Sequence, residues 1–96
     1  MARYLVLANF TDQGIRSVKE TTKRAQGFRD LASKMGAKIG DIYWTLGAYD
    51  VVLVMEAPND ETVTSVLLKA GSLGNLKSQT LRAFNEKEMD SILSKI

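Results

Sequence analysis

The chain has 96 residues, 45% of them hydrophobic and 25% charged, and a formal net charge of +2. This length suits one domain with one hydrophobic core, so we expect residues 1–96 to form a single domain. Cysteine and histidine are both absent, which excludes disulfides, thiol nucleophiles, Ser-His-Asp triads and the common zinc sites. No set of carboxylates has the spacing of a metal-binding loop, so we expect neither a metal site nor a cofactor.

The N-terminal segment predicts a central strand. Residues 3–9, RYLVLAN, form a nearly continuous apolar run, which is typical of a strand buried on both faces. A membrane-spanning helix needs about 20 apolar residues, and this run is far shorter. We therefore expect a cytoplasmic protein that does not contact a membrane.

A long amphipathic segment follows. Thr11 or Asp12 can cap a helix, and apolar residues recur at helical spacing from residue 15 to residue 35. Poor helix formers interrupt the middle of this segment, so the main helix begins either near residue 15 or only near Thr21. Residues 16–38 are rich in basic side chains. We interpret them as a solvated helix face and do not expect nucleic-acid binding.

The middle of the chain predicts an antiparallel hairpin. Residues 39–46 alternate loosely between apolar and polar, residues 47–50 (GAYD) have turn chemistry, and residues 51–57 form a second doubly apolar strand. The third strand of the chain, VVLVMEA, lacks the aromatic residues with which RNA-recognition motifs stack bases. That absence argues further against nucleic-acid binding.

The last third predicts a helix, a strand and a short final helix. Residues 58–60 (PND) close the third strand and cap a helix, and the glycine-rich residues 71–75 end it. Residues 76–84 predict a fourth strand. Asn85 opens a capping box before a C-terminal helix with an apolar stripe.

The element order β-α-β-β-α-β is that of the ferredoxin-like fold, an α+β architecture. Right-handed crossovers give a four-stranded antiparallel sheet of order 4-1-3-2 with the helices on one face. The two doubly apolar strands are then central, and one face of each has no helix above it. We expect a homodimer, or a larger homo-oligomer, through that sheet face. The alternative is that the C-terminal helix covers part of it.

The topology also brings three loops to one end of the sheet: residues 9–14, 47–50 and 71–75. These loops are rich in glycine and small polar residues. Each has a structural explanation as a helix cap or a turn, but loops held on a rigid scaffold are also common binding sites. We therefore place the candidate site at this loop end.

The sequences NFTDQGIR (9–16), GAYD (47–50), GSLGN (71–75) and TLRAF (80–84) resemble those of the GYD domain family. The resemblance covers nearly the whole chain and implies a ferredoxin-like fold related to the dimeric α/β barrel proteins. It implies no established activity. The residues that match the family pattern are Asn9, Asp12, Gly14, Gly47, Tyr49, Asp50, Gly74 and Arg82.

The candidate ligand-binding residues share the loop end; they are Asn9, Thr11, Asp12, Trp44, Tyr49, Asp50 and Asn75. Tyr49 and Asp50 can donate and accept a proton in a semi-enclosed site, or instead pack a ring and bond turn amides. Trp44 is expected in the core or at a dimer interface. Arg82 has three interpretations: an ion pair with Glu56, contact with an anionic ligand, or exposure on an edge strand.

Three functional hypotheses remain open, the third being a purely architectural module that only forms oligomers. The first is a small homo-oligomeric module, without catalysis, that binds a small molecule or a partner at the loop end. The second is a cofactor-independent enzyme of the dimeric α/β barrel type, an isomerase or oxygenase acting on a small, partly apolar substrate. Its catalytic candidates are Tyr49, Asp50, Asn9 and Arg82.

Overall fold

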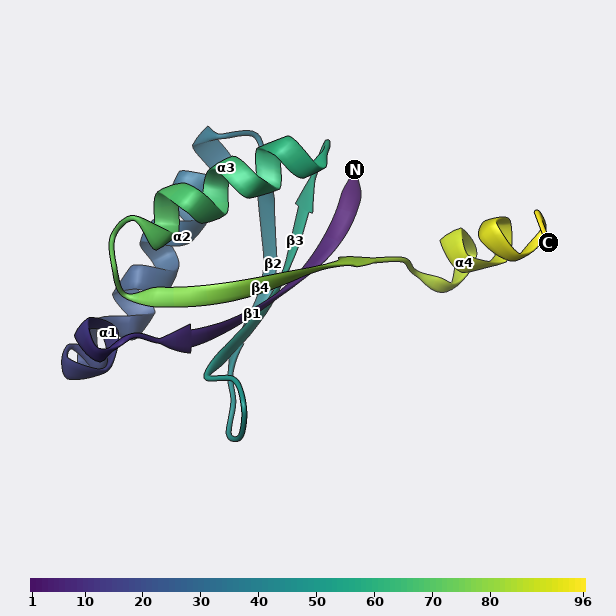
Figure 1. The fold of residues 1–96 in the computed structure, drawn as a ribbon. Helices are drawn as coiled ribbons and strands as arrows, with labels where there is room; N and C mark the ends of the chain where they lie inside the picture. The colour runs from purple at the N-terminus through teal and green to yellow at the C-terminus, as the bar shows by residue number, and fades with distance from the viewer.

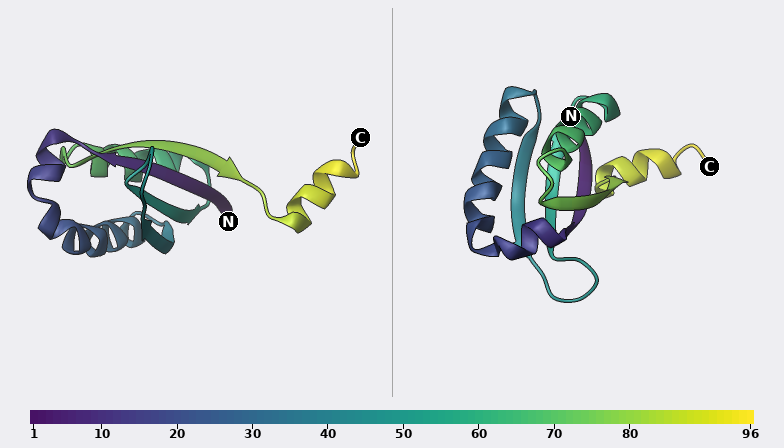
Figure 2. Two further views of the ribbon diagram at one scale, coloured as in Figure 1. Left: turned by 90° about the horizontal axis from the view of Figure 1, so that it is seen from below. Right: turned by 60° about the vertical axis from the view of Figure 1, so that its left-hand side comes forward.

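A computed structural model describes all residues from 1 to 96, and its sheet has the predicted strand order, read as β2-β3-β1-β4. Two long helices, α2 and α3, lie on one face of the sheet (Figures 1 and 2). The elements in chain order are β1 (Ala2–Phe10), α1 (Asp12–Arg16), a 3-10 turn (Val18–Glu20), α2 (Thr21–Lys34), β2 (Lys38–Trp44), β3 (Val51–Ala57), α3 (Asp60–Gly71), β4 (Leu76–Ala83) and α4 (Glu86–Leu93).

The two doubly apolar strands are central, as predicted. β1 pairs antiparallel with both β3 and β4, so that Leu5 lies opposite Val54 on one side and Leu81 on the other. β2 pairs with the outer edge of β3. β1 and β3 thus each have a neighbouring strand on both sides, as expected for central strands.

The core lies between the sheet and the two long helices. Alternate residues of β1 point into it, and Tyr4, Val6 and Ala8 are all at least 97% buried. They pack with residues of β3 and of both helices, chiefly Leu53, Met55, Ala32, Val63 and Val66. The pattern in which every second strand residue is buried is the one expected for a sheet covered on one face.

The opposite face of the sheet has no helix above it. Leu5 and Leu7 of β1 lie there beside Val52 and Val54 of β3, and all four are only half-buried. We call this surface, with Leu81 of β4, the open sheet face. α4 does not cover it: the helix extends away from the sheet beyond the end of β4 (Figure 1). The alternative in which the C-terminal helix covers this face is therefore wrong for this structure.

The amphipathic segment that follows β1 is not one helix. α1 ends at Arg16, because Ser17 has φ −113° and ψ 34°, outside the helical region. The main helix begins at Thr21, which is the later of the two predicted starting points. Thr11, not Asp12, caps α1, since its side chain accepts the N–H of Gly14.

The second strand is shorter than predicted and is irregular. It ends at Trp44, and Leu46 is fully exposed in the loop that follows. Ile39 pairs with Met55 and Ile42 with Leu53, so β2 contains one more residue than β3 between these two pairs, which is a β-bulge. This bulge changes which face the later residues occupy and brings Ile42 to the helix side.

The capping box predicted at Asn85 is present. None of the helices has the length and apolar character needed to cross a membrane.

Candidate functional site

The first strand and the hairpin are joined by the hydrogen bonds of Asn9 and Asp50. The Asp50 carboxylate accepts the backbone N–H of Phe10 at 2.9 Å and the Asn9 amide at 3.4 Å. The same Asn9 amide donates to the carbonyl of Ala48 at 2.8 Å. These bonds connect residues about 40 positions apart in the chain. We call this group, Asn9, Phe10, Ala48 and Asp50, the hairpin clasp.

The third loop is joined to the first in the same way. The Thr11 hydroxyl donates to the carbonyl of Gly74 at 2.6 Å, and the Thr11 N–H donates to the carbonyl of Asn75 at 3.1 Å. The Gln13 amide reaches the Leu73 carbonyl and the Asn75 side chain. The three predicted loops therefore do meet at one end of the sheet.

Close approach at this junction requires glycine at position 14. A Cβ atom built on Gly14 would lie 2.0 Å from the Asn75 carbonyl oxygen, which is far inside van der Waals contact. Gly74, on the other side of the same contact, has φ +85° and uses the left-handed conformation that glycine adopts without strain. The match of Gly14 and Gly74 to the family pattern thus has a backbone explanation.

Tyr49 and Asp50 are adjacent in sequence but have different partners. The Tyr49 hydroxyl donates to the Gln79 side chain on β4 at 2.9 Å, whereas Asp50 bonds to the end of β1. The Tyr49 carbonyl also accepts the Thr45 hydroxyl, which closes the hairpin loop. The contacts of this pair are therefore structural ones that hold the hairpin against β1 and β4. A role in binding ligand stays a prediction.

Asp12 and the polar side chains near it surround a second part of the loop end. Phe10, Thr11, Asp12, Gln13, Gly74 and Lys77 line a polar hollow of about 380 Å³. Only one of these six residues is hydrophobic. Such a surface suits polar contacts with a partner better than enclosure of an apolar molecule.

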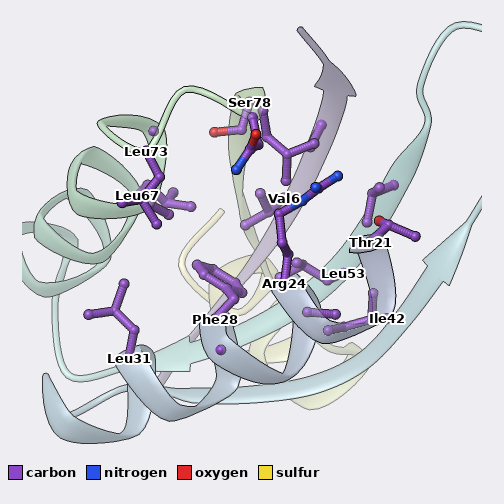
Figure 3. Close-up of a pocket in the computed structure, with 18 of the residues that line it drawn as sticks. Val6, Thr21, Arg24, Phe28, Leu31, Ile42, Leu53, Leu67, Leu73 and Ser78 are labelled. Atoms are coloured by element: carbon purple, nitrogen blue, oxygen red, sulfur yellow. The ribbon is translucent and has the colours of Figure 1, made fainter. Parts of the chain in front are cut away.

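A second, mainly apolar cavity lies between α2, α3 and the sheet (Figure 3). It has a volume of about 360 Å³, and 13 of its 20 lining residues are hydrophobic. Trp44 lines it while remaining 43% exposed, and its indole N–H donates to the Thr21 hydroxyl at 3.0 Å. Asn75 also lines this cavity, so two of the predicted ligand-binding residues border it.

Comparison with known families matches the GYD domain over residues 4–93, which is nearly the entire chain. The chain belongs to the GYD domain family. A relative from Thermus thermophilus, described as a glutamine synthetase and cystathionine beta-lyase binding protein, is 32% identical over 84 residues. The match covers 86% of this chain and 88% of the relative.

Solved structures resemble this GYD domain in fold. A feast or famine regulatory protein from M. tuberculosis, complexed with L-methionine, superposes with a TM-score of 0.68 at 12% identity. The match covers 88% of the GYD domain and 51% of the regulatory protein, so the domain spans about half of that chain. A Thermus thermophilus protein superposes with a TM-score of 0.57 at 21% identity, with 88% and 95% of the two chains covered.

Arg82 of the GYD domain is not part of the loop end. It lies opposite Tyr4 near the other end of the sheet, and its guanidinium stands 4.5 Å from the Phe84 ring centroid and 5.6 Å from that of Tyr4. Glu56, its predicted partner, pairs instead with Arg3 at 3.6 Å. The structure therefore separates Arg82 from the other catalytic candidates, Asn9, Tyr49 and Asp50.

Tyr4, beside Arg82, has the one clearly altered pKa in the GYD domain. Its hydroxyl donates to the Asp60 carboxylate at 2.5 Å. This hydrogen bond, and then burial of the ring, raise the pKa of Tyr4 above its ordinary value of 10.0. Sequence reasoning placed Tyr4 only in an apolar run and gave no signal for the carboxylate contact. No three carboxylates of the GYD domain lie where they could hold a metal ion.

Proposed function

We propose that this GYD domain is a self-associating binding module without catalysis, and that its loop end recognises a partner protein. The observation that carries the proposal is the 32%-identical relative that is described as binding two enzymes. That relative matches along 88% of its own length, so its described binding role needs no additional domain. Glutamine synthetase and cystathionine beta-lyase are accordingly the first partners to test.

The loop end supports this role through its rigidity. Hydrogen bonds from Asn9, Thr11 and Asp50 fix the three loops to one another. Exposed side chains project from the fixed loops, among them Leu46 and Leu73, which are 101% and 62% exposed. A preorganised surface loses little conformational freedom on binding, and apolar anchors surrounded by polar groups are typical of protein interfaces.

Self-association is supported by the open sheet face. Leu5, Leu7, Val52, Val54 and Leu81 form a continuous apolar set on three adjacent strands. Soluble monomers rarely expose a large contiguous apolar patch. A second copy of the chain offers the same face, and two such faces bury each other in an isologous dimer.

The test is a binding measurement with the two enzymes, purified from the organism that encodes this chain. The GYD domain is immobilised and each enzyme is passed over it. Leu46→Asp at the hairpin tip should weaken binding at least tenfold, because it removes an exposed apolar anchor. Leu93→Asp is the matched control, since Leu93 is 53% exposed on α4, which follows the end of β4 that lies away from the loop end (Figure 1). Binding of neither enzyme, or equal loss in both variants, would overturn the proposal.

A further inference from the structure

We propose that the cavity between α2, α3 and the sheet is a binding site for a small apolar monocarboxylate whose carboxylate pairs with Arg24. The cavity borders the loop end at Leu73 and Asn75, but the proposal does not depend on partner binding. Four features support the proposal: the size and lining of the cavity, the unpaired charge of Arg24, the absence of acidic lining residues, and the arrangement of polar and apolar groups along the cavity.

The size and lining of the cavity suit a small molecule. Its volume of about 360 Å³ lies at the lower end of the roughly 300–1,000 Å³ typical of ligand sites. The apolar part is formed by side chains of both helices and of the sheet, among them Phe28, Leu31, Leu67, Val6 and Leu53. Figure 3 shows these side chains converging from opposite sides of the cavity. Such walls favour a compact aromatic or branched hydrocarbon body.

Arg24 gives the cavity a positive charge that no carboxylate neutralises. Its Nη1 donates to the carbonyl and the hydroxyl of Ser17, both at 3.0 Å, and its Nη2 donates to the Gly14 carbonyl at 3.2 Å. The ion pairs of the chain involve Arg3 and Lys23, not Arg24. A guanidinium has five N–H donors, so two remain without a protein acceptor, one of them the Nε–H.

The charge of the lining selects an anion. Arg24 and Lys69 are the two charged residues among the 20 that line the cavity, and both are basic. An entering carboxylate therefore meets positive charge and no repelling acid. It would also form charge-assisted hydrogen bonds with the free donors of Arg24, which are stronger than neutral ones.

The polar groups lie at one end of the cavity, which orients the ligand. Arg24, Asn75 and Ser78 are near the loop end, since Ser78 pairs with Ala8 and Asn75 bonds to Thr11. Leu31 lies seven residues further along α2, roughly 10 Å away by the helical rise. A carboxylate at the loop end thus places the apolar body between Phe28, Leu31 and Leu67. A cavity with one charged end and one apolar end fits a monocarboxylate better than a phosphate or a diacid.

Trp44 provides a direct readout, because it is the one tryptophan of the chain and lines the cavity. The probes are 3-phenylpropionate and its neutral analogue 3-phenylpropionamide, each titrated against the full chain with Trp44 fluorescence and thermal unfolding as the signals. The acid should saturate the fluorescence change, raise Tm, and bind about tenfold more tightly than the amide, as expected for a charge-assisted hydrogen bond.

Arg24→Gln should remove the preference for the acid and leave the affinity for the amide nearly unchanged. Lys23→Gln is the matched control: it removes the same charge from the neighbouring residue, whose side chain is 85% exposed and outside the cavity. Equal binding of acid and amide to the unmodified chain would overturn the proposal, as would the absence of saturable binding. That comparison needs no variant and decides the question even where Arg24→Gln does not fold. Enzyme binding is measured separately, so its failure leaves this result intact.

Discussion

Asp50 bonds to the end of β1 through both its main chain and its side chain. Its N–H donates to the Ala8 carbonyl at 2.9 Å, and its carboxylate accepts the Phe10 N–H at 2.9 Å. The residue thereby extends the β1–β3 pairing beyond the first residue of β3 and provides an acceptor for a backbone N–H near the start of the turn into α1. An aspartate fits this position because its short side chain reaches an adjacent backbone group.

Asp50→Ala should lower the free energy of unfolding by about 1–2 kcal/mol, since it leaves the half-buried Phe10 N–H without its acceptor and removes the longer of the two hydrogen bonds of the Asn9 amide. Tyr49→Phe should cost less than about 1 kcal/mol, because the bond it removes, from Tyr49 to Gln79, is exposed. Urea denaturation of both variants measures the difference. A larger loss for Tyr49→Phe than for Asp50→Ala would contradict the assignment of Asp50 to the hairpin clasp.

Two glycines of the chain allow the same substitution to be compared in opposite settings. Gly14→Ala should destabilise the protein by more than about 2 kcal/mol, because the new Cβ would meet the Asn75 carbonyl oxygen at 2.0 Å. Gly27→Ala should stabilise it by about 0.5–1 kcal/mol, since Gly27 lies inside α2 and a Cβ there meets nothing within 4 Å.

Thermal and urea unfolding of both glycine variants provide the measurement. Gly27→Ala serves as the control for the general effect of replacing glycine by alanine. If Gly14→Ala unfolds at the same urea concentration as the original chain, the three loops are not held as closely as the structure indicates.

The strand order and the meeting of the loops could be predicted because each depends on short-range patterns. The apolar runs of β1 and β3 required two central strands, and one right-handed topology then placed the three loops together. The sequence did not indicate which alternate residues of β1 face the helices, since Tyr4 and Val6 are as apolar as Leu5 and Leu7. In the structure Tyr4 and Val6 face α2 and α3 and are buried.

The cavity and the role of Arg24 could not be predicted from the sequence. The cavity depends on how far α2 lies from α3, which no local pattern specifies. Arg24 is one of several basic residues in an amphipathic segment, and its neighbours gave no sign that it lines a cavity. The bulge in β2 could not be predicted either. In a regular strand, residues three positions apart lie on opposite faces, but the bulge places Ile39 and Ile42 on the same face.

Tyr4 should make stability fall at alkaline pH. Its pKa is raised in the folded chain by the hydrogen bond to Asp60 and by burial, so folding favours the neutral phenol. This contribution is fully present below the unfolded pKa of about 10 and is lost as pH rises through the higher folded pKa. Tyr4→Phe should remove that part of the pH dependence while costing about 1 kcal/mol at neutral pH for the lost hydrogen bond.

The measurement is urea denaturation from pH 8 to pH 11.5, together with ultraviolet titration of the phenols. The difference between the titration curves of the original chain and Tyr4→Phe isolates one of the three tyrosines. That component should titrate above pH 10. A component at or below pH 10 would show that the Asp60 contact does not hold the phenol in its neutral form.

The open sheet face predicts how self-association can be removed without unfolding the chain. Leu81 is suited to the test because it is 40% exposed on the edge strand β4 and lies opposite Leu5. Leu81→Lys should convert the proposed dimer into a monomer, since a dimer through this face would bury an unpaired charge. Leu68→Lys, at a 69% exposed position on the helix side, should leave the dimer intact.

Sedimentation equilibrium at micromolar concentration distinguishes the outcomes, and circular dichroism establishes that both variants are folded. Because Leu81 is partly exposed, its replacement should change the stability of the separated monomer by less than about 1 kcal/mol. The effect on assembly should therefore be larger than the effect on folding. An original chain that sediments as a monomer would mean that the apolar set formed by Leu5, Leu7, Val52, Val54 and Leu81 is not an interface between copies. Dissociation by Leu68→Lys as well would move the interface to the helix side.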